Sequence, residues 1–253
     1  MSAIAVSAIA FVIILAGVFV GALLRRALPS HHLAEDAKDV VRLGTGLIGT
    51  IAALVLGLLI ASAKSSFDTQ SGQIQQVTAD IVLLDRLLAQ YGPEARPIRE
   101  LMRRAIVPLV QRIWDAKESD GAKEAPFAAT SISEEAFAKI GQLAPQTDAQ
   151  RSLKDRAIKV STDLVQTRLL LFVQGGTSIP TPFLAVLVFW LAIIFLTFSL
   201  FSRLNPTLIT ALVVFALSAS AAIFLILELG EPFRGLMQIS SAPLSNALGP
   251  VEP

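Results

Sequence analysis

Apolar residues gather in four long runs, 1–24, 43–63, 182–201 and 206–227, and none of these runs contains a charged residue. About 20 apolar residues, rising 1.5 Å each, cross the hydrocarbon core of a bilayer as a helix. Two runs precede a long charged stretch and two follow it. The pattern therefore predicts four transmembrane helices, split two and two around a polar insert.

The second run has no proline or other strong stop at its end. At Lys64 the pattern changes from uniformly apolar to amphipathic, and apolar residues then recur at heptad-like spacing as far as Gly92-Pro93. We therefore expect one helix over 43–91 that crosses the membrane and runs on into water. We call the apolar positions of this repeat the seam. They are occupied by Phe67, Ile74, Val77, Ile81, Leu84 and Leu88, and Gln70 is the one polar residue at such a position.

The polar insert is predicted to form further helices. Pro97 opens one, which Pro108 should kink. Ser131 and Glu134 form a capping-box pattern for a second, and Asp148 can cap a third, which ends at Gly175-Gly176. The predicted fold is an all-α membrane protein with a helical soluble domain. Its expected parts are 1–64 (two spans), 65–180 (soluble domain), 181–229 (two spans) and 230–253 (C-terminal tail).

Composition supports the membrane class. The mean hydropathy is +0.64, and only 16% of residues are charged, against roughly a quarter in soluble proteins. A net charge of +1 gives no reason to expect a nucleic-acid partner. The absence of cysteine excludes disulfides and thiol chemistry. Because no basic segment or cleavage pattern accompanies the first run, we expect a retained helix there and not a signal peptide.

Two faces are visible in the run 43–63 at the three-and-four spacing of a helix. Leu54 and Leu58 lie on an aliphatic face, at the rim of a face of small residues. Small residues let helices approach closely, which suits a contact between subunits but also ordinary helix packing. The predicted packing face consists of Gly46, Ala53, Gly57 and Ala61, with Thr50 among them.

The tail carries the most specific local sequence. Glu231-Pro232-Phe233 follows the last span directly, and Ala242-Pro243-Leu244 follows some ten residues later. Together with the segment 54–59 (LVLGLL) and the order of spans, these motifs resemble the bestrophin family. The resemblance covers the whole architecture, while its specificity rests on these short motifs.

The resemblance implies a homopentamer in a bacterial inner membrane, with one ion pore lined by five copies of the second helix. Setting Leu56-Gly57 in register with the family's leucine-glycine pair places Thr50, Leu54 and Leu58 at a hydrophobic neck. Bestrophin necks are commonly more aromatic than this one. The acidic calcium cluster of animal members is reduced here to Glu228 and Glu231, so we expect neither metal nor cofactor.

Below the neck, the same helix offers Gln70, Gln73 and Asp80, which we expect to line a wider, water-filled vestibule. The leading functional hypothesis is therefore an ion channel. No ionisable residue lies within the four runs, which argues against a proton-coupled transporter.

The sequence leaves two other classes of protein open. The seam from Phe67 to Leu88 would also suit a non-conducting, membrane-anchored scaffold or sensor that signals through its helical domain. An enzyme is the weakest reading, because no nucleophile-base pair, phosphate loop or metal-ligand spacing occurs. The adjacent pair His31-His32 does not amount to a metal site, since neighbours on a helix point in different directions.

Two arguments about topology disagree. Arg25, Arg26, Lys38, Arg42 and Arg203 lie near one membrane side, and Lys64, Arg168 and Arg234 near the other. The positive-inside rule then places the soluble domain outside the cell. The family resemblance places it in the cytoplasm, and because five against three is a small bias, we follow the resemblance.

Overall fold

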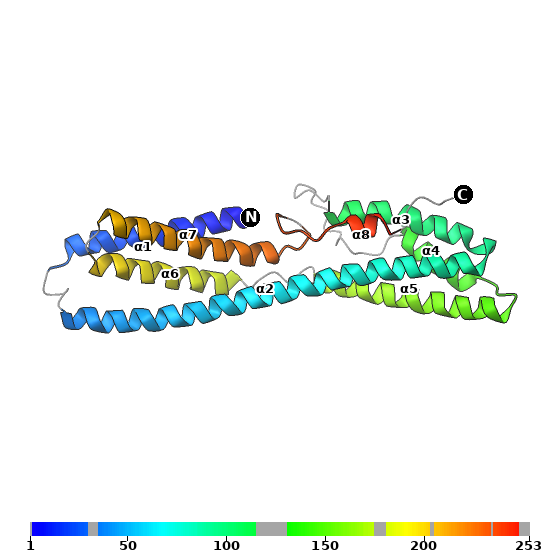
Figure 1. Ribbon diagram of the computed structural model, residues 1–253, viewed down its shortest axis with the longest axis horizontal. Helices are drawn as coiled ribbons and strands as arrows, with labels where there is room; N and C mark the ends of the chain where they lie inside the picture. Colours follow the sequence, from blue (N-terminus) through cyan, green and yellow to red (C-terminus); the bar gives the residue numbers. More distant parts are fainter. Residues whose placement is uncertain are drawn as a thin grey trace. The chain divides into compact units, whose positions relative to one another are not determined.

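The computed structural model describes residues 2–29, 35–114, 131–174, 181–202, 205–233 and 235–247 (Figure 1). The predicted connector with His31 and His32, the loop 121–130, Gly175-Gly176, Arg203 and Arg234 lie outside the described residues. The helices are α1 (Ala3–Ala27), α2 (Glu35–Tyr91), η2 (Pro93–Ala95), α3 (Arg96–Trp114), α4 (Ser131–Gln142), α5 (Asp148–Gln174), α6 (Thr181–Phe201), α7 (Pro206–Leu229) and α8 (Ala242–Ser245).

The four predicted membrane helices are confirmed as α1, α2, α6 and α7, which are long and apolar enough to cross a bilayer. Two of them extend further than their apolar runs. Helix α1 takes in Arg25 and Arg26, and α2 begins at Glu35, so the polar run before Leu43 is part of the helix. Long basic side chains at such an end can reach the headgroups while the helix continues.

The predicted stop of α2 is confirmed at Tyr91. Gly92 follows with φ of +131°, in the left-handed region that favours glycine. The amide Nε2 of Gln150 donates a 3.1 Å hydrogen bond to the Tyr91 carbonyl oxygen. The last turn of α2 is thereby joined to the first turn of α5.

The chain divides into two compact units, and α2 contributes to both. The membrane unit comprises residues 1–67 and 179–231. The helical unit comprises residues 68–178 and 232–253. The chain passes from one unit to the other within α2, between Phe67 and Asp68.

In the membrane unit, α1 packs against α6 and α7. A Cβ atom at Gly17 would come within 2.5 Å of the Ala192 carbonyl oxygen, and one at Gly21 would clash with the carbonyl oxygen of Leu196. The contact therefore requires glycine, as expected where membrane helices associate by close backbone approach. Across the α1–α7 contact, the hydroxyl of Ser220 donates a 2.6 Å hydrogen bond to the Ser7 carbonyl.

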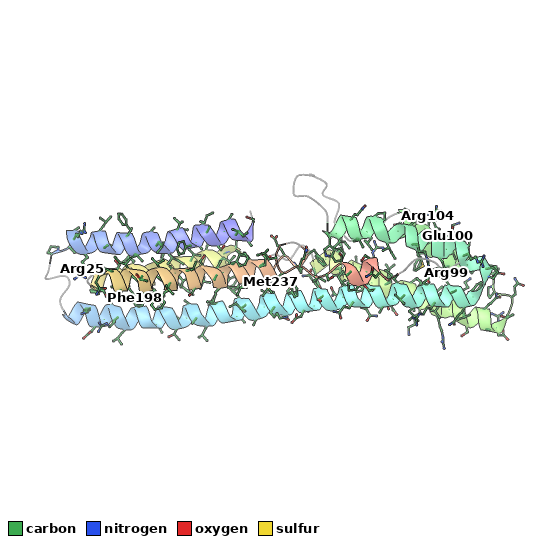
Figure 2. The ribbon with its side chains drawn as sticks, turned by 45° about the horizontal axis from the view of Figure 1, so that its top comes forward. Arg25, Arg99, Glu100, Arg104, Phe198 and Met237 are labelled. Carbon is green, nitrogen blue, oxygen red and sulfur yellow. The ribbon has the colours of Figure 1, made fainter. Side chains whose placement is uncertain are left out.

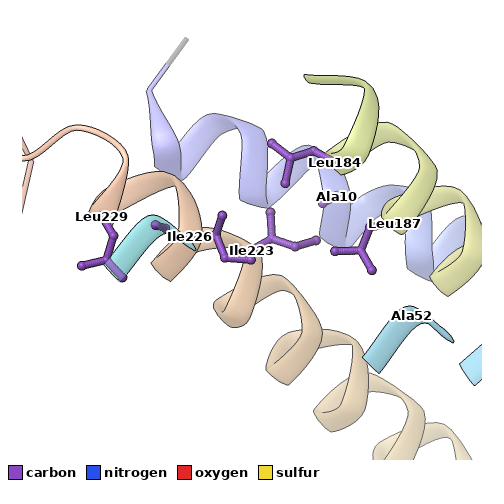
Figure 3. Close-up of a cluster of buried hydrophobic side chains, with 8 residues drawn as sticks. Ala10, Ala52, Leu184, Leu187, Ile223, Ile226 and Leu229 are labelled. Atoms are coloured by element: carbon purple, nitrogen blue, oxygen red, sulfur yellow. The ribbon is translucent and has the colours of Figure 1, made fainter. Parts of the chain in front are cut away.

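A cluster of buried apolar side chains joins all four membrane helices (Figure 3). Helix α2 contributes Ala52 and Ala63 to it, with Leu56, Leu59 and Ile60 packed alongside. One face of the membrane part of α2 is thus fixed within its own chain. The other members are Ala10, Leu184, Leu187, Ile223, Ile226 and Leu229.

In the helical unit, the predicted seam of α2 is buried from Ile74 to Leu88, and residues of α3 such as Ile98 and Ile113 are buried too. Phe67, the first residue of the seam, is half-buried against the cluster of the membrane unit. Arg99 of α3 lies beside α2 (Figure 2), where its Nε and Nη2 atoms donate to both carboxylate oxygens of Asp85 at 2.8 and 2.9 Å. Such a two-point bond fixes the register of two helices. Helix α3 continues through Pro108.

The N-terminal cap of α5 differs from the prediction. The Thr147 hydroxyl accepts a 3.1 Å hydrogen bond from the backbone N–H of Gln150, so the cap is Thr147 and not Asp148. Asp148 lies in the first turn and pairs with Arg151 at 2.9 Å. Both are cap-forming residue types, and the sequence pattern did not separate adjacent ones.

The tail folds onto α3 within the helical unit. The indole Nε1 of Trp114 donates a 2.7 Å hydrogen bond to the Ile239 carbonyl, and the ring meets the Phe233 ring edge-on at 5.8 Å. Leu244 of α8 is fully buried. The tail is thus a packed part of the helical unit.

Candidate functional site

The membrane part of α2 has a second face that its own chain does not cover. Leu54 and Leu58 are each 70% exposed, although both are large apolar side chains. A Cβ atom at Gly46 or Gly57 would meet no atom within 4 Å. We call this surface the exposed face of α2. It comprises Leu43, Gly46, Leu47, Thr50, Ala53, Leu54, Gly57, Leu58 and Ala61.

All the residues predicted for the neck and the packing face lie on this exposed face. The one polar group among them, the Thr50 hydroxyl, donates a 3.0 Å hydrogen bond to the Gly46 carbonyl in the preceding turn. Its hydrogen is therefore satisfied inside the helix. The face can contact another helix or border a narrow space without leaving this donor unpaired.

Leu47 belongs to the same face, with 64% of its side chain exposed. Leu59, by contrast, packs against the buried cluster of the membrane unit. Leu47 therefore shares the face of Leu54 and Leu58, and Leu59 does not. Only Leu59 represents the opposite face.

The predicted vestibule residues lie elsewhere. Gln70 and Asp80 are only 4% and 6% exposed, and Gln73 is half-buried. This burial does not fit a water-facing lining. The physical reason is that the apolar seam of α2 faces the interior of its own chain, and Gln70 occupies a slot of that seam.

Asp80 lies in the part of α2 beyond its apolar run, where its Oδ1 atom accepts a 2.8 Å hydrogen bond from Gln76 Nε2. Burial raises the pKa of the Asp80 carboxyl above its ordinary value of 3.8, the bond from Gln76 lowers it, and the Asp163 carboxylate raises it again. Burial outweighs the hydrogen bond. The ionised form of Asp80 is consequently less favourable in the folded chain than in the unfolded chain.

Replacing Asp80 by asparagine should therefore stabilise the protein at neutral and alkaline pH. Because the folded-state pKa lies above the unfolded value, the contribution of Asp80 to the free energy of unfolding is fully present below about pH 4 and is lost as the pH rises through the folded-state pKa. Asparagine can keep the bond from Gln76 and carries no charge. We expect Asp80→Asn to raise the melting temperature by roughly 2–4 °C at pH 8, and by nothing at pH 4. An equal shift at both pH values would contradict this account.

The residues of the C-terminal motif Glu231-Pro232-Phe233 differ in how exposed they are. Pro232 is buried, Phe233 contacts Trp114, and Glu231 is exposed. Sequence reasoning missed Trp114, whose partner Ile239 lies 125 residues away. No local sequence pattern predicts a contact between residues so far apart. Phe233 and Trp114 together account for the docking of the motif on α3.

The acidic residues near the motif form no evident metal site. Glu228 is buried at the end of α7, while Glu231 is exposed. Within the described ranges, no three histidine, aspartate, glutamate or cysteine side chains gather as a metal would require. The helical unit contains instead an apolar cavity of about 630 Å³. Its lining includes Ile106, Leu109, Phe137, Val165, Leu169 and Phe172.

The arrangement of the helices is similar to that of solved membrane-protein structures. The fold is similar to that of a crystal structure of a variant bacterial bestrophin homologue from Klebsiella pneumoniae. It is 18% identical, with a TM-score of 0.65 over 92% of this chain and 94% of that chain. A crystal structure titled only as a membrane protein gives 17% identity and a TM-score of 0.65 over 94% of both chains. Another crystal structure of the Klebsiella homologue is 18% identical, with a TM-score of 0.61 over 92% of this chain and 94% of that chain.

At this identity, the structural likeness establishes a shared fold. The family follows from the sequence itself, because residues 12–244 match the model of the Bestrophin-like domain. The chain therefore belongs to the Bestrophin-like family. No protein of curated function matches it.

Proposed function

We propose that the chain is one subunit of a homopentameric ion channel whose pore is lined by the exposed face of α2. Proteins of the Bestrophin-like family and fold are known as ion channels. The observation that carries the proposal for this chain is the 70% exposure of Leu54 and Leu58 on a helix whose opposite face is fixed inside the membrane unit.

Small residues on the exposed face support assembly. Packing and close backbone approach drive helix association in lipid, where apolar surface alone gives no preference. Gly46, Ala53, Gly57 and Ala61 would let neighbouring copies of α2 come close. Leu54 and Leu58 would then project toward the symmetry axis, beside these contacts.

A ring of leucines at such a constriction can stop ions without a charged barrier. Water leaves a narrow apolar passage, and an ion that enters must give up hydration without compensation. Thr50 would add a ring at the same neck, with its hydroxyl hydrogen already bound to the helix. The proposed gate is therefore a hydrophobic neck formed by Thr50, Leu54 and Leu58.

Single-channel recording of the purified protein in planar bilayers tests the proposal. We expect discrete conductance steps, whereas vesicles without protein should give none. Silence of both the wild type and a variant with an opened neck, at demonstrated reconstitution, would favour a non-conducting scaffold or sensor. The exposed apolar side chains around the cavity of the helical unit, such as Phe137 and Leu169, would then be the surface that receives a partner.

The proposal includes an orientation with the helical unit in the cytoplasm of a bacterial cell. Ala144 is exposed between α4 and α5, so a reporter inserted after it should leave the fold intact. A reporter active only in the cytoplasm is expected to be active there. Activity of a periplasmic reporter at the same position would contradict the proposed orientation and would agree with the count of basic residues under the positive-inside rule.

A further inference from the structure

Shortly after the last membrane helix, the tail turns back on itself and exposes two large apolar side chains. The carbonyl oxygen of Pro232 accepts a 2.7 Å hydrogen bond from the backbone N–H of Ile239, which closes the turn. We call residues 232–239 the tail loop. Leu236 and Met237 lie within it and are 79% and 43% exposed (Met237 is labelled in Figure 2).

The base of the tail loop is held in place by α3. The indole Nε1 of Trp114 donates its hydrogen bond to the Ile239 carbonyl, and the same ring contacts Phe233. One side chain of α3 therefore holds both ends of the loop. Gly235 has φ of +90°, a backbone conformation that favours glycine. The exposure of Leu236 is thus a property of a closed and docked loop.

Exposed apolar side chains of the helical unit gather near the membrane spans. Among the described residues of this unit, the three most exposed large apolar side chains are Leu236 at 79%, Val173 at 62% and Leu169 at 59%. Helix α7 ends at Leu229, seven positions before Leu236. Helix α6 begins at Thr181, eight positions after Val173. Single exposed apolar residues are ordinary, but a gathering beside two spans indicates a common apolar neighbour.

We propose that the tail loop lies in the membrane interface and that Leu236 and Met237 insert into lipid at the boundary between headgroups and acyl chains. The inference does not depend on the proposed channel function, because it requires only that α7 crosses the bilayer. Seven residues of chain span at most about 25 Å, so Leu236 stays within that reach of the end of the span. Apolar side chains of interfacial segments enter this boundary by about 5–10 Å.

The composition and bonding of the tail suit this position. No acidic residue occurs between Pro232 and Ala247, so the tail brings no carboxylate to a bilayer surface that carries anionic headgroups. The bond that closes the loop pairs the N–H of Ile239 with a carbonyl oxygen. Unpaired backbone groups oppose entry into apolar surroundings, and here two of them are satisfied within the loop.

Quenching by nitroxide-labelled lipids tests the inference in the full chain reconstituted into vesicles. The chain has no cysteine, so Leu236→Cys introduces a single thiol for a nitrobenzoxadiazole fluorophore. We expect lipids with the nitroxide near the headgroup to remove most of the fluorescence. Lipids with the nitroxide at the end of the acyl chain should remove less, because the loop enters the interface and does not span the bilayer. Met237→Cys should give the same order.

The matched control is Arg156→Cys. Arg156 is exposed on α5 of the same unit and lies about 25 Å along that helix from Val173. Its fluorophore should be quenched by iodide, present on both sides of the membrane, and by neither lipid. For Leu236→Cys, quenching by iodide alone would place the loop in water, and protection from every quencher would place it against protein. Either result would overturn the inference and leave the proposed channel standing.

Discussion

Replacing Leu54 and Leu58 together by alanine is expected to raise open probability in planar bilayers by about tenfold or more. Each substitution removes most of an apolar side chain that is 70% exposed in the subunit. The fold of the subunit should not suffer, because these side chains are not packed in its interior. A wider and less apolar neck keeps its water, so ions pass. Each single variant should show a smaller increase.

The control for this prediction is Leu59→Ala. Leu59 is a leucine of the same helix but packs against the buried cluster of the membrane unit, so its loss should affect stability and leave open probability nearly unchanged. Leu47 cannot serve as a control because it lies on the exposed face. If Leu59→Ala and the double variant opened the channel equally, the effect would be a general loosening and the neck would lie elsewhere.

Introducing leucine at Gly57 or Ala53 should dissociate the assembly. A new side chain at Gly57 meets open space in the subunit, so the subunit is expected to fold normally. Between subunits, the same side chain would force helix backbones apart where close packing is the main attraction. Light-scattering mass in detergent should fall from that of the oligomer toward that of one chain.

Two controls separate assembly from folding. Gly44→Leu also meets no atom within 4 Å but lies roughly 140° from Gly57 on the helix, so its oligomer should persist. Gly21→Leu should instead disrupt the subunit, because α1 and α6 touch there through their backbones. An unchanged oligomer for both Gly57→Leu and Ala53→Leu would show that the subunit contact lies elsewhere.

The membrane helices and the end of α2 were predictable because their causes are local. A bilayer demands an unbroken apolar run in which every backbone group is bonded within the helix, and such a run is visible in sequence. The stop at Tyr91 depends on Gly92, whose backbone conformation favours glycine. These elements need no knowledge of distant residues.

The faces of α2 were harder to assign because a heptad seam shows which residues gather and not which neighbour covers them. Gln70 and Asp80 were expected to face water, yet the chain's own helical unit buries them. The docking of the tail on Trp114 joins residues 125 apart, and no local pattern predicts that contact.

Electron cryomicroscopy of the purified, reconstituted protein tests the central claim most directly. The expected result is a ring of five copies with α2 nearest the axis and its narrowest point at Leu54 and Leu58. A single chain, or an assembly in which the exposed face of α2 contacts lipid and another helix borders the axis, would contradict the account.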